Sequence, residues 1–75
     1  MEEDKQAICD ALCKTLRLTG GASDLIRIVY HRTGGMEYAE LKFQGSLRRR
    51  VNITRDSGTA MIRDILRHIY ILRHI

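Results

Sequence analysis

The amino-acid sequence predicts an α+β fold, a two-layer sandwich in which two helices pack on one face of a three-stranded antiparallel sheet. Hydrophobic residues recur with helical spacing near both ends of the chain, whereas hydrophobic and polar residues alternate with a period of two between them. All six glycines lie where the pattern changes, and they divide the chain into five elements in the order α-β-β-β-α. The length of 75 residues predicts a single domain, residues 1–75, too small to enclose a deep substrate cavity.

The first element is predicted as an amphipathic helix over residues 3–18. Its apolar stripe consists of Ile8, Leu12, Thr15 and Leu16. Acidic residues stand at its start and the pair Gly20–Gly21 follows its end, which suits the helix dipole and a glycine C-cap.

Residues 24–32 and 36–44 are predicted as a β-hairpin. The loop Gly34–Gly35 favours a type I′ or II′ turn, and it fixes a register in which the numbers of paired residues add to 69. A slip by one residue would turn the apolar side chains to the other face, so this register is well specified. The predicted pairs on the apolar face are Ile26–Phe43, Ile28–Leu41 and Tyr30–Ala39, with Arg32 opposite Glu37 at the end.

The third strand is predicted after a three-residue connection around Gly45–Ser46, and its register is left open. On this strand Val51 and Ile53 share one face with Arg49. The opposite face carries Arg48, Arg50, Asn52 and Thr54.

The last helix is predicted to begin at a cap formed by Asp56 or Ser57 and to continue to the C-terminus. Its core stripe consists of Met61, Ile62, Ile65, Ile69 and Leu72. Further apolar residues widen this surface beyond what a small sheet and one helix would cover. The sequence ILRHI occurs twice, at 65–69 and 71–75, and because this spacing is not helical the second copy faces another direction.

The outward face of the sheet carries the strongest functional signal. Arg27 lies opposite Lys42, and like charges in a cross-strand pair repel unless Glu40 or a bound anion compensates. A basic sheet surface with an aromatic ring can bind a phosphate backbone and stack a base. The predicted polyanion-binding residues are Arg27, His31, Tyr38, Lys42, Arg48, Arg50 and Asn52. The alternative is that these side chains are only solvated and that the arginines protect a sheet edge against aggregation.

Apolar side chains expected at the surface predict self-association as a homodimer, or a protein partner. The residues predicted for this contact are Leu25, Val29, Leu66, Ile71 and Ile75. In the alternative function, the apolar last helix docks on another copy or another protein and the chain binds no nucleic acid.

No catalytic motif occurs, so the sequence predicts no enzyme, no small-molecule substrate and no cofactor. Cys9 and Cys13 are predicted as buried structural thiols, with a metal site or redox chemistry as alternatives; the pair lies within a helix rather than in a zinc-knuckle turn. The segment 56–59, Asp-Ser-Gly-Thr, is predicted as a helix cap, with anion binding at the helix N-terminus as the alternative.

The charge distribution favours an anionic partner. The net charge is +4, and residues 25–56 hold an excess of +4 whereas residues 1–24 hold −2. The acidic start differs from a secretory leader, which predicts a cytoplasmic protein with reduced thiols. Arginines interrupt the most apolar stretch, residues 65–75, so no membrane span is predicted.

The order α-β-β-β-α, at about this length, resembles the double-stranded RNA-binding domain. That family binds through its first helix, its first hairpin loop and a lysine cluster that opens its second helix. Here residues 57–61 read Ser-Gly-Thr-Ala-Met, without lysine, and the hairpin loop Thr33–Gly34–Gly35 lacks the family's Gly-Pro-x-His. The resemblance concerns the order of elements and assigns no binding residue.

Overall fold

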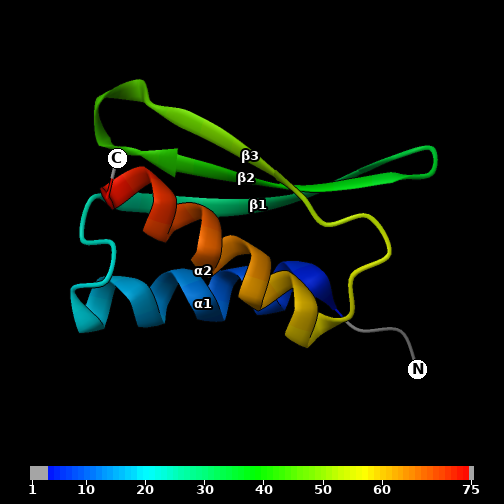
Figure 1. Ribbon diagram of the computed structural model, residues 1–75, viewed down its shortest axis with the longest axis horizontal. Helices are drawn as coiled ribbons and strands as arrows, with labels where there is room; N and C mark the ends of the chain where they lie inside the picture. The colour runs from blue at the N-terminus through cyan, green and yellow to red at the C-terminus, as the bar shows by residue number, and fades with distance from the viewer. Residues whose placement is uncertain (1–3, 75) are drawn as a thin grey trace.

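The computed structural model describes residues 4–74, with the side chains of residues 4–72. Its elements are α1 (Lys5–Thr19), β1 (Leu25–Thr33), β2 (Met36–Phe43), the short 3₁₀ turn η1 (Gln44–Ser46), β3 (Arg48–Asn52) and α2 (Gly58–His74). The strands form one antiparallel sheet in the order β1-β2-β3. Both helices lie on the same side of this sheet (Figure 1), which confirms the predicted two-layer α+β sandwich.

The ends of α1 are set by the two residues that flank it. The Asp4 carboxylate accepts a hydrogen bond of 3.0 Å from the backbone N–H of Ala7, which satisfies one of the unpaired donors of the first turn. Gly20 ends the helix with a φ of +78°, in the left-handed region that glycine adopts without a steric penalty. The predicted glycine C-cap is therefore confirmed.

The buried side of α1 is centred on its two cysteines. Cys9, Cys13 and Leu16 are buried, with Ile8 and Leu12 packed beside them and partly covered. The predicted inclusion of Thr15 in the apolar stripe is wrong. Thr15 is exposed, and its hydroxyl donates to the backbone oxygen of the preceding turn at 2.9 Å.

The β1–β2 hairpin has the predicted register over most of its length. The pairs run from Arg27–Lys42 to Thr33–Met36, and the numbers of the paired residues add to 69. Gly34 has a φ of +60° and is the only one of the two loop glycines with a positive φ, as in a type II′ turn.

A β-bulge at the start of β1 changes which side chain enters the core. Leu25 pairs with Phe43, and the register shifts before Arg27. Leu25 is consequently 1% exposed and Ile26 is 51% exposed. The predictions that Ile26 lies in the core and that Leu25 lies on the outer surface are both wrong. The cause lies in the preceding turn, where the Leu25 N–H donates to the oxygen of Ala22 at 3.1 Å and directs Leu25 inward.

The connection between β2 and β3 spans three residues, as predicted. The Phe43 N–H donates to the Leu47 oxygen at 2.8 Å, so residues 44–46 form the loop. In the sheet Val51 lies opposite Ala39, and both are buried against the helices. This pairing fixes the register that the sequence left open.

The Ser57 hydroxyl oxygen accepts the N–H of Ala60 at 3.2 Å, which confirms the predicted cap of α2.

The core fills the space between the helical layer and the sheet. The buried hydrophobic residues are Cys9, Cys13, Leu16, Ala22, Leu25, Ile28, Ala39, Leu41, Phe43, Val51, Ile53, Met61, Ile65 and Ile69. Each fully buried leucine or isoleucine stabilises the fold by about 1.5–3 kcal/mol relative to exposure. None of the helices among residues 4–74 combines the length and the hydropathy that a membrane span requires.

Candidate polyanion-binding face

The side of the sheet that faces away from the helices carries all seven predicted polyanion-binding residues. Directly paired strand residues point to the same side, so the register places them in three rows. The rows are Arg27–Lys42–Arg48, Val29–Glu40–Arg50 and His31–Tyr38–Asn52. We call this surface the basic face. It brings side chains from all three strands within about 5 Å of their neighbours across the strands.

Glu40 occupies the centre of the basic face and is only 9% exposed. Its Oε1 lies 3.5 Å from Nε2 of His31 and 3.9 Å from Nζ of Lys42. Both distances exceed the roughly 2.7–2.9 Å of a charge-assisted hydrogen bond, so the carboxylate compensates its neighbours only in part. Four Lys and Arg side chains surround this one acid, which leaves the face positively charged.

Two neighbouring groups already contact the ring of Tyr38. The His31 ring is stacked on it with a centroid distance of 4.8 Å and an interplanar angle of 19°. Cζ of Arg50 lies 5.0 Å from the centroid of the Tyr38 ring, within the range of a cation–π contact. A base that stacked on Tyr38 would therefore compete with these groups.

A shallow hollow of about 470 Å³ opens beside Tyr38, within the size range of small-ligand sites. Its lining residues are Thr33, Met36, Glu37, Tyr38, Arg50 and Asn52. Thr33 and Met36 are not among the predicted site residues. They form the last pair before the Gly34–Gly35 turn, and their position beside the basic face follows from the predicted register.

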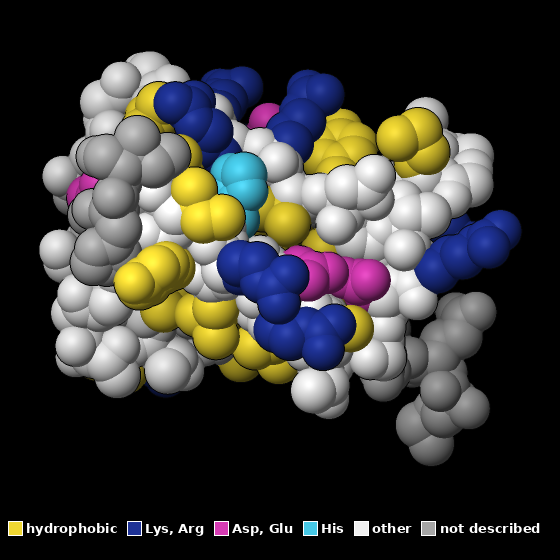
Figure 2. Space-filling model, in the orientation of Figure 1, with side chains coloured by type: hydrophobic (Ala, Val, Ile, Leu, Met, Phe, Trp, Pro, Cys, Tyr) yellow, Lys and Arg dark blue, Asp and Glu magenta, His cyan; other side chains and the backbone are white. Residues whose placement is uncertain are grey.

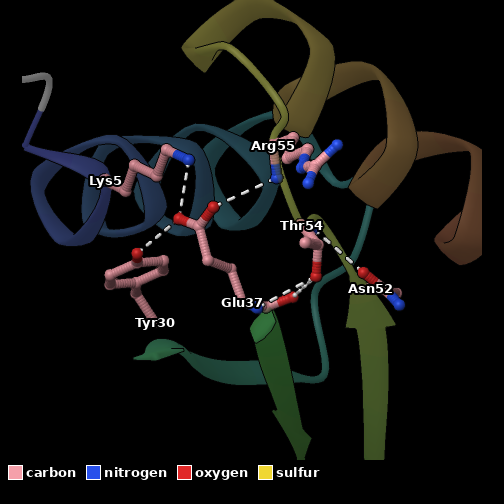
Figure 3. A network of polar contacts seen from close by, with 6 residues as sticks. All are labelled: Lys5, Tyr30, Glu37, Asn52, Thr54 and Arg55. Atoms are coloured by element: carbon pink, nitrogen blue, oxygen red, sulfur yellow. Dashed lines mark hydrogen bonds and ion pairs between the residues drawn. The ribbon is translucent and has the colours of Figure 1, made fainter. Parts of the chain in front are cut away.

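A polar network joins Glu37, at the start of β2, to α1, β1 and the turn before α2 (Figure 3). Lys5 of α1 donates to Oε2 of Glu37 at 2.7 Å, and the Tyr30 hydroxyl donates to the same oxygen. The backbone N–H of Arg55 donates to Oε1 at 3.1 Å. These donors, with the Lys5 bond as the largest cause, lower the pKa of Glu37 from 4.5 to about 2.

Asn52 is held at the margin of the basic face by the same turn. Its Oδ1 accepts the Thr54 N–H at 2.9 Å, while the Thr54 hydroxyl exchanges hydrogen bonds with the backbone of Glu37. The bond through Oδ1 fixes the amide and leaves its NH₂ group as the donor available to a ligand.

The residues predicted for self-association do not form one surface. Leu66 and Ile71 of α2 are 40% and 49% exposed, and Tyr70 beside them is 63% exposed. Hydrophobic side chains reach the surface around α2, which lies in front in this view (Figure 2). Val29 lies instead on the basic face beside Glu40. Leu25 belongs to the core, and Ile75 lies outside the described residues.

Cys9 and Cys13 are buried and unpaired, as expected of structural thiols. Burial is the main cause that raises the pKa of Cys9 to about 11, so its reactive thiolate is scarce at neutral pH. Sγ of Cys13 lies 3.7 Å from the backbone oxygen of Ile26. Among the side chains of residues 4–72, no three metal-ligating groups come together.

Two carboxyl groups, those of Asp56 and Asp64, lie together at the start of α2. Ser57 serves as its cap, and contact with the Asp64 carboxyl is the main cause that raises the pKa of Asp56. An anion at this helix terminus would meet two carboxyl groups. The structure therefore favours the capping interpretation of residues 56–59.

Comparison with models of protein families, with curated proteins and with solved structures finds no significant match for this chain. The geometry of the chain itself is therefore the guide to its function. That geometry defines a small α+β protein with a basic sheet face that no other element among residues 4–74 covers.

Proposed function

We propose that this protein is a non-enzymatic interaction module whose basic face binds single-stranded nucleic acid. One observation carries the proposal: the register gathers Arg27, Lys42, Arg48 and Arg50 on a sheet face that no other described element covers. Long cationic side chains at neighbouring positions of a sheet suit an extended phosphate backbone.

The phosphates supply most of the affinity in this proposal. They bind the four Lys and Arg side chains and displace the counterions condensed on the nucleic acid. A base enters the hollow beside Tyr38 and shares that ring with Arg50 and His31. Because those groups must rearrange, binding depends more on phosphate contacts than on base identity.

Fluorescence anisotropy with a labelled single-stranded oligonucleotide of mixed sequence tests this proposal at several salt concentrations. With four phosphates neutralised, the logarithm of the association constant should fall against the logarithm of salt with a slope of about −3. Arg27→Glu or Arg50→Glu should abolish binding, whereas Arg67→Glu on the exposed surface of α2 applies the same charge change and should weaken it little. Binding that either sheet variant retains at high salt would refute the proposal.

The exposed apolar surface of α2 supports a second candidate function, homodimerisation or docking of a protein partner. Leu66, Tyr70 and Ile71 expose apolar area on one helix that the sheet and α1 leave uncovered. Analytical ultracentrifugation of the chain and of the double variant Leu66→Gln/Ile71→Gln tests it. A dimer that the double variant converts to monomer is expected; an unchanged mass would contradict self-association through α2.

The cytoplasm is the location proposed for both functions. Two unpaired cysteines fit a compartment in which thiols stay reduced. A nucleic-acid ligand is also abundant there.

A further inference from the structure

The two edges of the sheet differ in how their backbone groups are satisfied. At the β1 edge, Gln6 of α1 bonds to the strand as another strand would. Its Nε2 donates to the Ile28 oxygen at 3.1 Å, and its Oε1 accepts the Tyr30 N–H at 2.8 Å. The thiol of Cys13 contacts the Ile26 oxygen on the same edge at 3.7 Å. Side chains of α1 thus close this edge to any added strand.

The β3 edge is open. Two hydrogen bonds show which backbone groups of residues 47–53 turn toward β2. The Phe43 N–H donates to the Leu47 oxygen, and the Ile53 N–H donates to the Glu37 oxygen, so the odd-numbered residues of 47–53 face β2. Arg48, Arg50 and Asn52 consequently turn theirs outward. β3 lies at the margin of the sheet (Figure 1), and no segment among residues 4–74 pairs with its outer side.

Three exposed arginines determine the charge of this edge. Arg48 and Arg50 point to the basic face and Arg49 to the opposite face, opposite Leu41. Nη1 of Arg49 donates to the Arg48 oxygen at 2.8 Å, which brings its guanidinium to the outer side of the strand. Positive charge therefore lines the open edge on both faces.

This charge disfavours a second copy as the added strand. An antiparallel pair that used all five residues of β3 would place Arg50 opposite Arg50 of the other copy. Like charges directly opposite each other destabilise a strand pair. A strand with carboxylates at the same positions would have the opposite effect.

We propose that the β3 edge binds an extended acidic peptide, which adds to the sheet as a fourth strand. The outward N–H and C=O of Arg50 pair with the peptide backbone. Carboxylates at consecutive peptide positions meet Arg48, Arg49 and Arg50 in turn, because successive positions of both strands alternate between the faces. The peptide backbone displaces the Arg49 guanidinium from the Arg48 oxygen and frees it for a carboxylate.

This site shares Arg48 and Arg50 with the basic face, whereas Arg49 and Arg27 each belong to only one of the two sites. Arg49 lies on the other face of the sheet, and Arg27 lies on β1 at the opposite edge. Arg49→Glu and Arg27→Glu therefore form a matched pair that separates the two sites. Both positions are exposed, so neither substitution disturbs the core.

Fluorescence anisotropy with a labelled peptide that carries a central run of glutamates between valines tests the proposal. Arg49→Glu should weaken binding at least about tenfold, equivalent to about 1.4 kcal/mol, and Arg27→Glu should change it little. The same peptide with N-methylated backbone amides keeps its charges but cannot pair as a strand, and it should also bind at least about tenfold more weakly.

Hydrogen exchange provides a second readout. The outward N–H of Arg50 should exchange more slowly when the peptide is bound, because it then donates to the peptide backbone. Three results would overturn the proposal. The first is that the N-methylated peptide binds as tightly as the unmodified peptide. The second is that Arg27→Glu loses peptide binding while Arg49→Glu keeps it. The third is that the hydrogen-exchange rate of the Arg50 N–H stays the same under saturating peptide.

Discussion

Glu37 connects more parts of the chain than any other residue of the polar network. Its carboxylate accepts donors from α1, β1 and the turn before α2, while its backbone pairs with Thr54 and Ile53. The sequence predicted only that Arg32 lies opposite it. The donors Lys5 and Arg55 could not be predicted, because their positions depend on how α1 and the β3–α2 turn pack on the hairpin.

Glu37→Gln should lower the free energy of unfolding at pH 7 by about 1–3 kcal/mol, because Lys5 loses its charged partner. The pKa of Glu37 is lowered from 4.5 to about 2, so its stabilising contribution is complete above about pH 4.5 and is lost as the pH falls toward 2. The variant should therefore lose less stability over this range than the parent protein.

Urea unfolding at a series of pH values measures both effects of Glu37→Gln. Asp10→Asn is a matched control, since Asp10 is an exposed acid whose hydrogen bond from Gln6 an asparagine oxygen also accepts. The control should keep the pH dependence of the parent. An identical dependence in Glu37→Gln would show that Glu37 is not the group responsible.

At the scale of the element, β1 shows which strand pairs the period-two hydrophobic pattern predicts and which it does not. The pattern and the Gly34–Gly35 loop were enough to predict every pair from Arg27 to Thr33. They failed at the start of the strand, where Leu25 and Ile26 are both apolar and alternation alone does not choose between them. The choice is made by the turn after α1, through the bond from Leu25 to Ala22.

Alanine substitutions at these two adjacent positions test the bulge. Leu25→Ala should destabilise the protein by about 2–5 kcal/mol, because it leaves a cavity among residues that cannot collapse around it. Ile26→Ala removes a half-exposed side chain and should cost less than about 1 kcal/mol. Thermal or urea unfolding of both variants gives the comparison. A larger loss of stability in Ile26→Ala than in Leu25→Ala would contradict the bulge and support the uninterrupted register, which places Ile26 in the core.

The arrangement of the candidate site could be predicted only where the register of the strands could be predicted. The outward set of β1 and β2 followed from the hairpin register, and the outward set of β3 followed from alternation. The central position of Glu40 and the contact of Arg50 with Tyr38 were not predictable, because both require the β2–β3 register. The sequence could not fix that register, since the loop at Gly45–Ser46 permits several pairings.

At the scale of the whole molecule, two of the proposed contact surfaces, the basic face and the apolar surface of α2, lie on opposite layers. The basic face covers the outside of the sheet, and the exposed apolar side chains belong to α2 in the helical layer. A second copy docked on α2 would leave both basic faces free. The dimer would then bind a long nucleic acid through two faces, and the second contact would form at a high effective concentration.

Chain length of the oligonucleotide should therefore separate the effect of dimerisation from that of the basic face. On a long strand, Leu66→Gln/Ile71→Gln should bind at least about tenfold more weakly than the parent protein, because the second contact is lost. On a strand that covers only one face, the two proteins should bind equally, since neither substitution changes charge. Leu18→Gln, at an exposed position of α1, is the matched control and should behave as the parent does on both strands. Anisotropy titrations on both lengths give the result, and a double variant that bound the long strand as tightly as the parent would show that the two faces do not act together.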